Sequence, residues 1–223
     1  MIDSKIHVYF MPGMAASPEI FEHISLPKSK YEIHYLRWEI PEENETIESY
    51  AKKMAKRVIH NNVVLIGVSF GGVLVQEMSV FLNLKKLIII SSIKSREEMP
   101  RRMRVASKLK LYKVVPYKIV QNVEWLSKYA FGEFAKNKIA LYKRYLSVND
   151  KRYLRWALEH MVDWKPKNNK GVKIIHIHGE RDTVFPYKKI KQQVIPVKKG
   201  SHAMIVTSYK WLNENLPKII EAD

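Results

Sequence analysis

The fold is decided by residues 63–78, which read VVLIGVSFGGVLVQEM. The apolar run at 63–68 is typical of a strand that is buried on both faces, and the residues after Ser69 favour a helix. Between them, GVSFG at 67–71 predicts a sharp strand-to-helix turn that strains the backbone of Ser69 and exposes its hydroxyl. Glycine is needed two residues before and two after the serine, because larger side chains would collide across the turn.

Short apolar runs rich in Ile, Val and Tyr recur on both sides of this turn, at 5–11, 31–36, 62–68, 86–91, 172–178 and 193–197. Helical patterns alternate with them, and Ser17-Pro18 is typical of a further helix start. The longer helical patterns lie at 46–60, 70–82 and 203–221. The alternation predicts a doubly wound α/β fold with a mostly parallel, six-stranded sheet.

The alternation stops in residues 94–170. This segment has helical patterns near 97–112, 117–131, 133–147 and 150–163, but no convincing strand. We therefore expect a helical cap at 94–170, inserted into one core domain that is formed by 1–93 and 171–223.

The formal net charge of +17 is concentrated in the expected cap, which holds 20 lysines and arginines against 7 acidic residues. A basic surface favours anionic partners such as an acidic carrier protein or a phosphate-bearing substrate, and a solvated surface without a partner is the alternative. No nucleic-acid motif accompanies the charge, so we expect no specific nucleic acid partner. The densest basic cluster is Arg101, Arg102, Arg104, Lys108, Lys110 and Lys113.

Composition excludes several classes of protein. The chain has no cysteine, which rules out disulfides, thiolate metal sites and a cysteine nucleophile. Its apolar runs are far shorter than the ~20 residues that span a bilayer, so we expect no membrane span. The first ten residues lack the basic-then-apolar layout of a signal peptide, and we expect a cytoplasmic protein.

A serine hydroxyl becomes a nucleophile only when a base takes its proton and a third group holds the base in the right tautomer. Asp182 follows the predicted strand that ends near residue 178, and His202 follows the predicted strand at 193–197. Ligands bind beyond the carboxyl ends of strands in open α/β sheets, which is where both loops fall. The chain order Ser69, Asp182, His202 is the order expected for a nucleophile on such a turn.

These features together resemble the α/β-hydrolase fold superfamily of serine hydrolases, over nearly the whole chain. The resemblance lies in the Gly67–Gly71 turn, the acid loop Gly179–Pro186 and the loop of His202. It implies Ser69, Asp182 and His202 as catalytic triad, no metal and no cofactor. The cap lies where the family usually carries one, and the two antiparallel strands that often open the family's sheet are missing.

The resemblance also implies an oxyanion hole. Its first donor is the backbone N–H of the residue after the nucleophile, here Phe70. The second comes from the loop after the first parallel strand, MPGMA at 11–15, where many relatives have His-Gly and this chain has Pro-Gly. Met14 is the better candidate for that donor, with Met11 and Ala15 as alternatives.

Other residues compete for some of these roles. The acid of the triad could instead be Glu180, Asp163, or Glu97 or Glu98 after the earlier strand. His176 and His178 share one face of a strand and could bind a metal, although no further ligands are evident. The remaining histidines receive no role: His7, His23, His34, His60 and His160.

The sequence predicts a serine hydrolase that cleaves a small-molecule carboxylic ester through an acyl-enzyme. An acyl-CoA or acyl-carrier-protein thioesterase, recruited by the basic cap, is one alternative. A non-catalytic small-molecule binding protein on the same fold is another, since fold alone does not determine function. In the family that the chain resembles, dehalogenation uses an aspartate nucleophile, so a serine at this position argues against that reaction. The substrate itself is not readable from the sequence.

Overall fold

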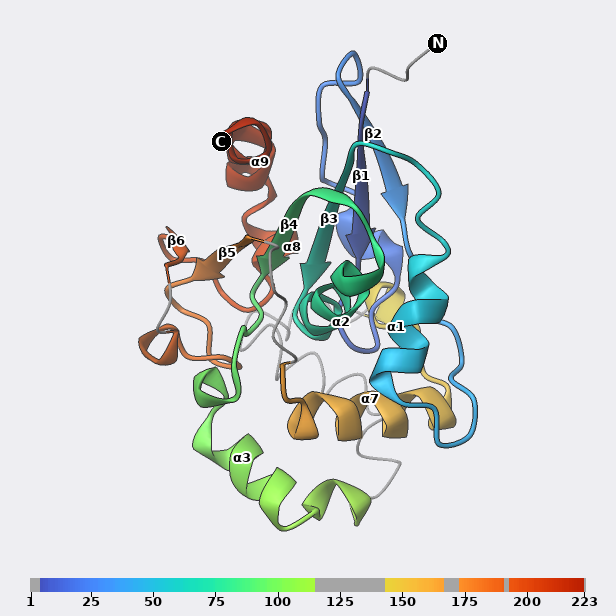
Figure 1. Ribbon diagram of the computed structural model, residues 1–223. Coiled ribbons are helices and arrows are strands. Elements are labelled where there is room, and N and C mark those ends of the chain that lie inside the picture. The colour runs from blue at the N-terminus through green and yellow to red at the C-terminus, as the bar shows by residue number, and fades with distance from the viewer. Residues whose placement is uncertain (1–4, 115–142, 167–172, 191–192, 223) are drawn as a thin grey trace.

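The computed structural model describes residues 5–114, 143–166, 173–190 and 193–222. Six strands form a single sheet in the order β2-β1-β3-β4-β5-β6, and every neighbouring pair is parallel (Figure 1). The prediction of a doubly wound parallel sheet is thereby confirmed. The strands are β1 (Ile6–Met11), β2 (Tyr31–Tyr35), β3 (Val63–Val68), β4 (Leu84–Ile90), β5 (Ile174–Gly179) and β6 (Ile195–Val197).

The strands at the centre of the sheet are mostly apolar because both of their faces are covered. All six residues of β1 and all six of β3 are buried, as are the last four of β4. The edge strand β2 is less covered: Tyr31 is buried, Ile33 and His34 are partly exposed, and Glu32 and Tyr35 are exposed. The hydrophobic core therefore lies along both sides of β1, β3 and β4.

Helices flank the sheet (Figure 1). The N-terminus of α1 is capped by the Thr46 hydroxyl, which accepts a hydrogen bond from the Ser49 N–H, and the helix buries Tyr50, Ala51, Met54 and Ala55. The α-helices are α1 (Ile47–Ala55), α2 (Phe70–Met78), α3 (Arg101–Lys108), α7 (Lys151–Asp163), α8 (Met204–Thr207) and α9 (Tyr209–Glu221). The short 3-10 helices are η1 (Pro18–Phe21), η2 (Ser79–Phe81), η3 (Arg96–Glu98), η4 (Leu111–Lys113) and η6 (Tyr187–Lys189).

The described part of the expected cap contains α3 and α7, which pack against each other below the carboxyl ends of the strands in Figure 1. Asp163 at the end of α7 accepts hydrogen bonds from the hydroxyls of Ser107 (2.5 Å) and Tyr112 (2.7 Å), which joins the two segments. The helix expected at 117–131 and most of the one expected at 133–147 lie outside the described residues. Residues 143–145 are helical.

Candidate active site

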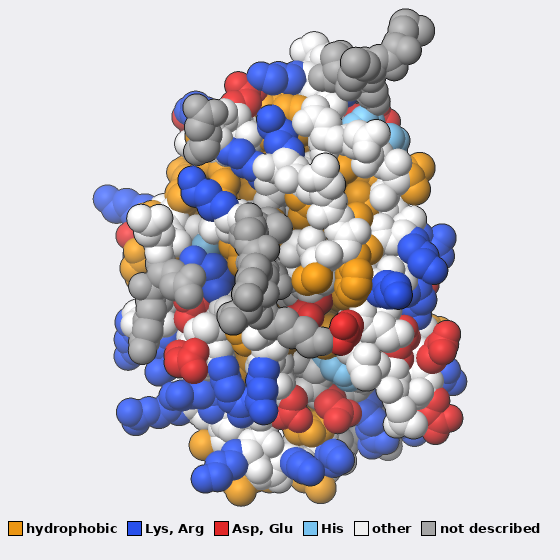
Figure 2. All heavy atoms as spheres, viewed as in Figure 1, with side chains coloured by type: hydrophobic (Ala, Val, Ile, Leu, Met, Phe, Trp, Pro, Cys, Tyr) orange, Lys and Arg blue, Asp and Glu red, His pale blue; other side chains and the backbone are white. Residues whose placement is uncertain are grey.

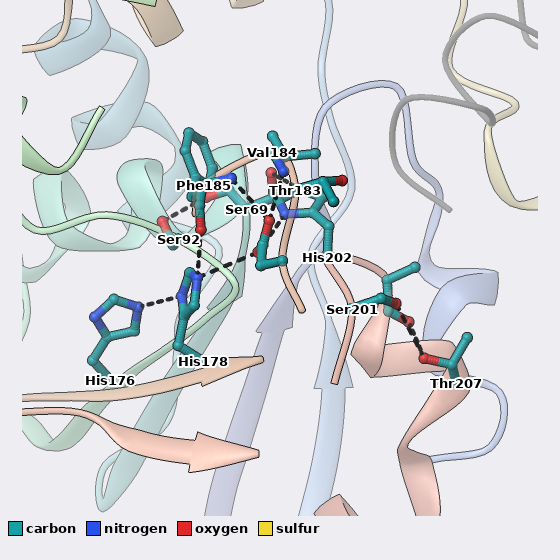
Figure 3. Close-up of polar contacts among 12 residues, drawn as sticks. Ser69, Ser92, His176, His178, Thr183, Val184, Phe185, Ser201, His202 and Thr207 are labelled. Atoms are coloured by element: carbon teal, nitrogen blue, oxygen red, sulfur yellow. Dashed lines mark hydrogen bonds and ion pairs between the residues drawn. The ribbon is translucent and has the colours of Figure 1, made fainter. Parts of the chain in front are cut away.

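Ser69 lies between the end of β3 and the start of α2, at the carboxyl edge of the sheet. Its backbone has φ of 52° and ψ of −119°, a conformation that L-residues rarely adopt. Two contacts with the end of β4 hold this strained turn. The Ser69 N–H donates to the Ile90 carbonyl at 2.9 Å, and the Ser92 hydroxyl donates to the Ser69 carbonyl at 2.7 Å (Figure 3).

The two glycines around Ser69 are required for different steric reasons. A Cβ atom at Gly67 would lie 2.4 Å from the Gly71 carbonyl oxygen, a collision across the turn itself. A Cβ atom at Gly71 would lie 2.3 Å from the Pro12 carbonyl oxygen, in the loop after β1. The second glycine thus lets the Ser69 turn approach the neighbouring loop, a contact between segments that the pentapeptide alone does not reveal.

The structure brings Ser69, His202 and Asp182 together from three different loops. Figure 3 shows Ser69 beside His202. His202 Nε2 lies 2.9 Å from Ser69 Oγ, and His202 Nδ1 lies 2.8 Å from Asp182 Oδ2. The other oxygen of Asp182 accepts hydrogen bonds from the backbone N–H groups of Val184 and Phe185, both at 2.8 Å. With both carboxylate oxygens bonded, the acid has a fixed orientation toward His202.

The competing acids lie elsewhere in the described residues. Glu180 is exposed and directly follows β5, the strand that precedes Asp182. Glu98 accepts the Lys94 N–H at 2.6 Å, and Asp163 accepts hydrogen bonds from the hydroxyls of Ser107 and Tyr112. Among the acids that the sequence left open, Asp182 is the one in hydrogen-bond contact with His202.

Two buried histidines of β5, His176 and His178, lie next to Asp182. His176 Nε2 lies 3.0 Å from His178 Nδ1, and His178 Nε2 lies 2.8 Å from the Phe185 carbonyl and 3.4 Å from Asp182 Oδ2. Burial lowers the pKa of His178, and burial together with the nearby His178 and Lys94 lowers the pKa of His176 to about 2. Both rings are therefore neutral near pH 7. Their alternation on the strand was visible in the sequence, but their contact with the acid loop was not.

The loop after β1 is held by two aromatic side chains that the sequence did not indicate. Trp38 Nε1 donates to the Gly13 carbonyl at 2.8 Å, and the Ala15 N–H donates to the Tyr153 hydroxyl at 3.2 Å. Ala15 is thus already bonded, whereas the Met14 N–H has no acceptor within the described part of the chain.

A cavity of about 370 Å³ opens beside Ser69 and His202. Its walls come from the loop after β1 and from α3, α7 and α8. Nearly all of the side chains that line it are apolar, and Arg102 is the cation among the described residues of the wall. The apolar walls include Met14, Ile20, Met103, Leu158, Met161, Val162, Phe185, Ile205 and Val206.

Structures solved for other proteins share this architecture. An esterase from Exiguobacterium antarcticum superposes with a TM-score of 0.71 and 15% identity, covering 98% of this chain and 93% of its own. This esterase has the α/β-hydrolase fold, as do a matching bromoperoxidase and a matching thioesterase. The chain has the α/β-hydrolase fold.

Other α/β-hydrolase folds match it similarly. A bromoperoxidase from Bacillus anthracis has a TM-score of 0.69 and 15% identity over 98% of this chain and 92% of its own. The RedJ thioesterase of the prodiginine biosynthetic pathway in Streptomyces coelicolor has a TM-score of 0.63 and 14% identity, covering 97% of this chain and 86% of its own. No protein-family model and no curated protein sequence matches the chain. Of the helices that the structure describes, none combines the length and the apolar character needed to cross a membrane.

Proposed function

We propose that the protein is a serine hydrolase that cleaves carboxylic esters with an apolar acyl group. The observation that carries the proposal is the hydrogen-bonded chain from Ser69 through His202 to Asp182, with bonds of 2.9 and 2.8 Å, at the wall of an apolar cavity. Esterases and other hydrolases among the structures of the same fold are consistent with it.

Each residue of the chain has a chemical role in this proposal. Ser69 Oγ attacks the ester carbonyl while His202 Nε2 takes its proton, and Asp182 keeps Nδ1 protonated and stabilises the imidazolium that forms. His202 then donates the proton to the departing alkoxide, which leaves an acyl group on Ser69. A water molecule hydrolyses this ester with His202 acting again as base.

The oxyanion that forms on the substrate needs donors fixed in place. The N–H groups of Phe70 and Met14 fill this role in the proposal. Phe70 is the first residue of α2, so its N–H is one of the groups that a helix leaves without an internal partner. Losing one such donor costs about 3–4 kcal/mol of transition-state stabilisation in comparable enzymes.

Active-site labelling tests the nucleophile. A fluorophosphonate probe should modify Ser69, as mapped by mass spectrometry of the labelled peptide. Ser69→Ala should fold normally, resist labelling and lose most turnover, whereas Ser29→Ala in an exposed turn should behave like the wild type. Labelling of another serine, with Ser69 unmodified in active protein, would refute the assignment.

A series of p-nitrophenyl esters tests the apolar acyl group. The cavity should favour acyl chains of several carbons over acetate in kcat/KM, because each buried methylene contributes about 0.8 kcal/mol. Leu158 lines the cavity and is partly exposed, so Leu158→Trp should shift the optimum toward shorter chains. Val80→Trp on an exposed site is the matched control. A preference for acetate in the wild type would contradict the proposal.

Thioesters of an anionic carrier are a second candidate substrate class, favoured by the position of Arg102. This arginine lines the cavity, its Nη2 donates to the Thr183 carbonyl at 3.2 Å, and the exposed Arg101 lies next to it. Lys and Arg side chains gather at the lower left of Figure 2, in the region of α3. The charge of the expected cap would steer an acidic carrier protein or coenzyme A toward this entrance.

Ionic strength separates the two classes of substrate. For an anionic thioester, kcat/KM should fall as salt rises beyond 0.1 M, where the Debye length is about 10 Å, while a small neutral ester should be little affected. Charge reversal at Arg101, Arg102 and Arg104 should weaken the thioester reaction selectively. An equal response to salt would leave the basic residues as solvated surface.

A further inference from the structure

Three histidines that lie far apart in the sequence come together near the amino ends of the strands. Ser69 lies at the other edge of the sheet, where the strands have their carboxyl ends. His7 is in the first half of β1, His34 is in β2, and His60 is in the loop between α1 and β3. Each ring offers one nitrogen, and the three nitrogens lie within 4.8 Å of one another. Histidine side chains are visible at the surface at the upper right of Figure 2, where β1 and β2 lie in Figure 1.

The pairing of two parallel strands places two of these rings on the same face. His7 pairs with Glu32, and Tyr9 pairs with His34, so all four side chains lie on one side of the β1–β2 ladder. His60 approaches from the loop because the His7 N–H donates to the Asn62 carbonyl at 3.2 Å, which joins the end of this loop to β1.

The rings are in direct contact. His7 Nδ1 lies 2.9 Å from His34 Nε2, and the rings of His7 and His60 are stacked with centroids 3.9 Å apart. A neutral imidazole nitrogen is the form in which histidine binds a metal, and it is also the commonest metal ligand in proteins.

We propose that His7, His34 and His60 together bind one divalent transition-metal ion, with zinc as the ion that their chemistry fits best. Three imidazoles suit zinc, which binds nitrogen at about 2.0–2.1 Å in a tetrahedron, so that ligand atoms lie about 3.3–3.4 Å apart. To reach this spacing, the nitrogens of His7 and His34, now 2.9 Å apart, would separate by about 0.5 Å. The His60 nitrogen, which lies at most 4.8 Å from the other two, would move toward them by up to about 1.5 Å. Because the rings of His7 and His60 are stacked almost parallel, the partly exposed His60 ring would also have to turn out of the stack so that its free nitrogen faces the ion.

Two neighbouring groups favour a cation at this place. The Tyr9 hydroxyl lies 2.6 Å from His60 Nδ1 and orients that ring, as second partners of metal-binding histidines do. Glu32 Oε1 lies 3.9 Å from His34 Nε2 and brings a negative charge to the solvent-exposed side of the three histidines. His7 is buried, whereas His34 and His60 are partly exposed, so an ion can reach the site from solvent.

The position of the site indicates a structural role. Ser69 follows the carboxyl end of β3, and His7 is close to the amino end of the adjacent β1, so the length of a strand separates the two centres. A bound ion would link β1, β2 and the loop before β3. We therefore expect it to stabilise the fold without taking part in ester cleavage.

Zinc titration of untagged protein tests the proposal. After treatment with EDTA and its removal, calorimetry should show one tight zinc per chain, and cobalt at the same site should give the visible absorption of a tetrahedral ion. Tm should rise with zinc, by about 5–10 °C at 100 times the dissociation constant. Ser69→Ala should bind zinc equally well, so the result does not depend on the proposed function.

Two partly exposed ligands provide the variants. His34→Asn and His60→Gln, each checked for folding by circular dichroism, should weaken zinc binding by at least about 10–100-fold and abolish the cobalt spectrum. His23→Gln, a half-exposed histidine outside the cluster, should bind like the wild type. The proposal would be overturned by the absence of stoichiometric binding in the wild type, or by unchanged affinity in both folded ligand variants.

Discussion

His178 Nε2 lies 3.4 Å from Oδ2 of Asp182, and both side chains are completely buried. The same nitrogen lies 2.8 Å from the Phe185 carbonyl, while His176 bonds to the other ring nitrogen of His178. A single tautomer satisfies these contacts: Nε2 of each ring carries the proton, and His178 Nδ1 accepts. The proposed acid is thus packed against a neutral N–H donor that also holds its loop.

From this arrangement we expect His178 to act as a positioning residue for Asp182. His178→Phe should lower kcat by about 5–10-fold with little change in KM, because it removes a buried donor worth about 1 kcal/mol. His178→Gln, which retains an N–H in nearly the same place, should recover most of the loss. Equal losses in both variants, or a change in KM alone, would point to a packing role instead.

The identity of the acid is tested by a pair of amide substitutions. In Asp182→Asn, the remaining oxygen would still accept the N–H groups of Val184 and Phe185, so the amide N–H₂ would face His202 and favour the wrong tautomer. We expect a loss of about 10²–10⁴-fold in kcat, at most as large as that of His202→Ala. Glu180→Gln, at an exposed site, should retain activity. The reverse pattern in steady-state assays would move the acid to Glu180.

Tyr153 should affect catalysis through the loop that contains Met14. Tyr153→Phe removes the acceptor of the Ala15 N–H, at a residue with φ of 61°, and so loosens the proposed oxyanion donor beside it. We expect kcat to fall several-fold with KM nearly unchanged. Tyr31→Phe removes a tyrosine hydrogen bond to Glu221 far from Ser69 and serves as the control. A similar kcat in both variants would contradict the link.

Acid should destabilise the protein through its neutral buried histidines. The pKa of His176 is lowered to about 2 by burial and nearby positive charge, against about 6.5 in the unfolded chain. Between these values the unfolded state binds more protons, so the free energy of unfolding falls as pH drops below about 6.5, with a slope of up to about 1.4 kcal/mol per pH unit. The pKa of His178 is lowered too, and it acts in the same direction.

Urea unfolding between pH 7.5 and 5 measures this dependence. His176→Gln keeps a polar group near the Nε2 position but cannot take up the proton, so the fall in stability with decreasing pH should be shallower than in the wild type. His23→Gln, at a half-exposed site, should leave the slope unchanged. A His176→Gln slope identical to that of the wild type would show that this ring does not cause the acid sensitivity.

The sequence by itself determined the α/β architecture and the residues that meet at the carboxyl edge of the sheet. Local apolar runs and helical stripes decide where strands and helices form, because their side chains must reach a common core. Parallel strands end at one edge, so Ser69, Asp182 and His202 could be expected to lie close together from their places after β3, β5 and β6 alone.

Contacts between distant segments were decided only by the tertiary structure. His7, His34 and His60 show no pattern in the sequence, because their meeting depends on the register of β1 against β2 and on the path of one loop. The support of the loop after β1 by Trp38 and Tyr153 has the same origin. The periodicity of a sequence indicates which face of its own helix or strand a residue occupies. Which residue of another element lies opposite it is decided by packing, and for this reason the sequence alone did not predict these contacts.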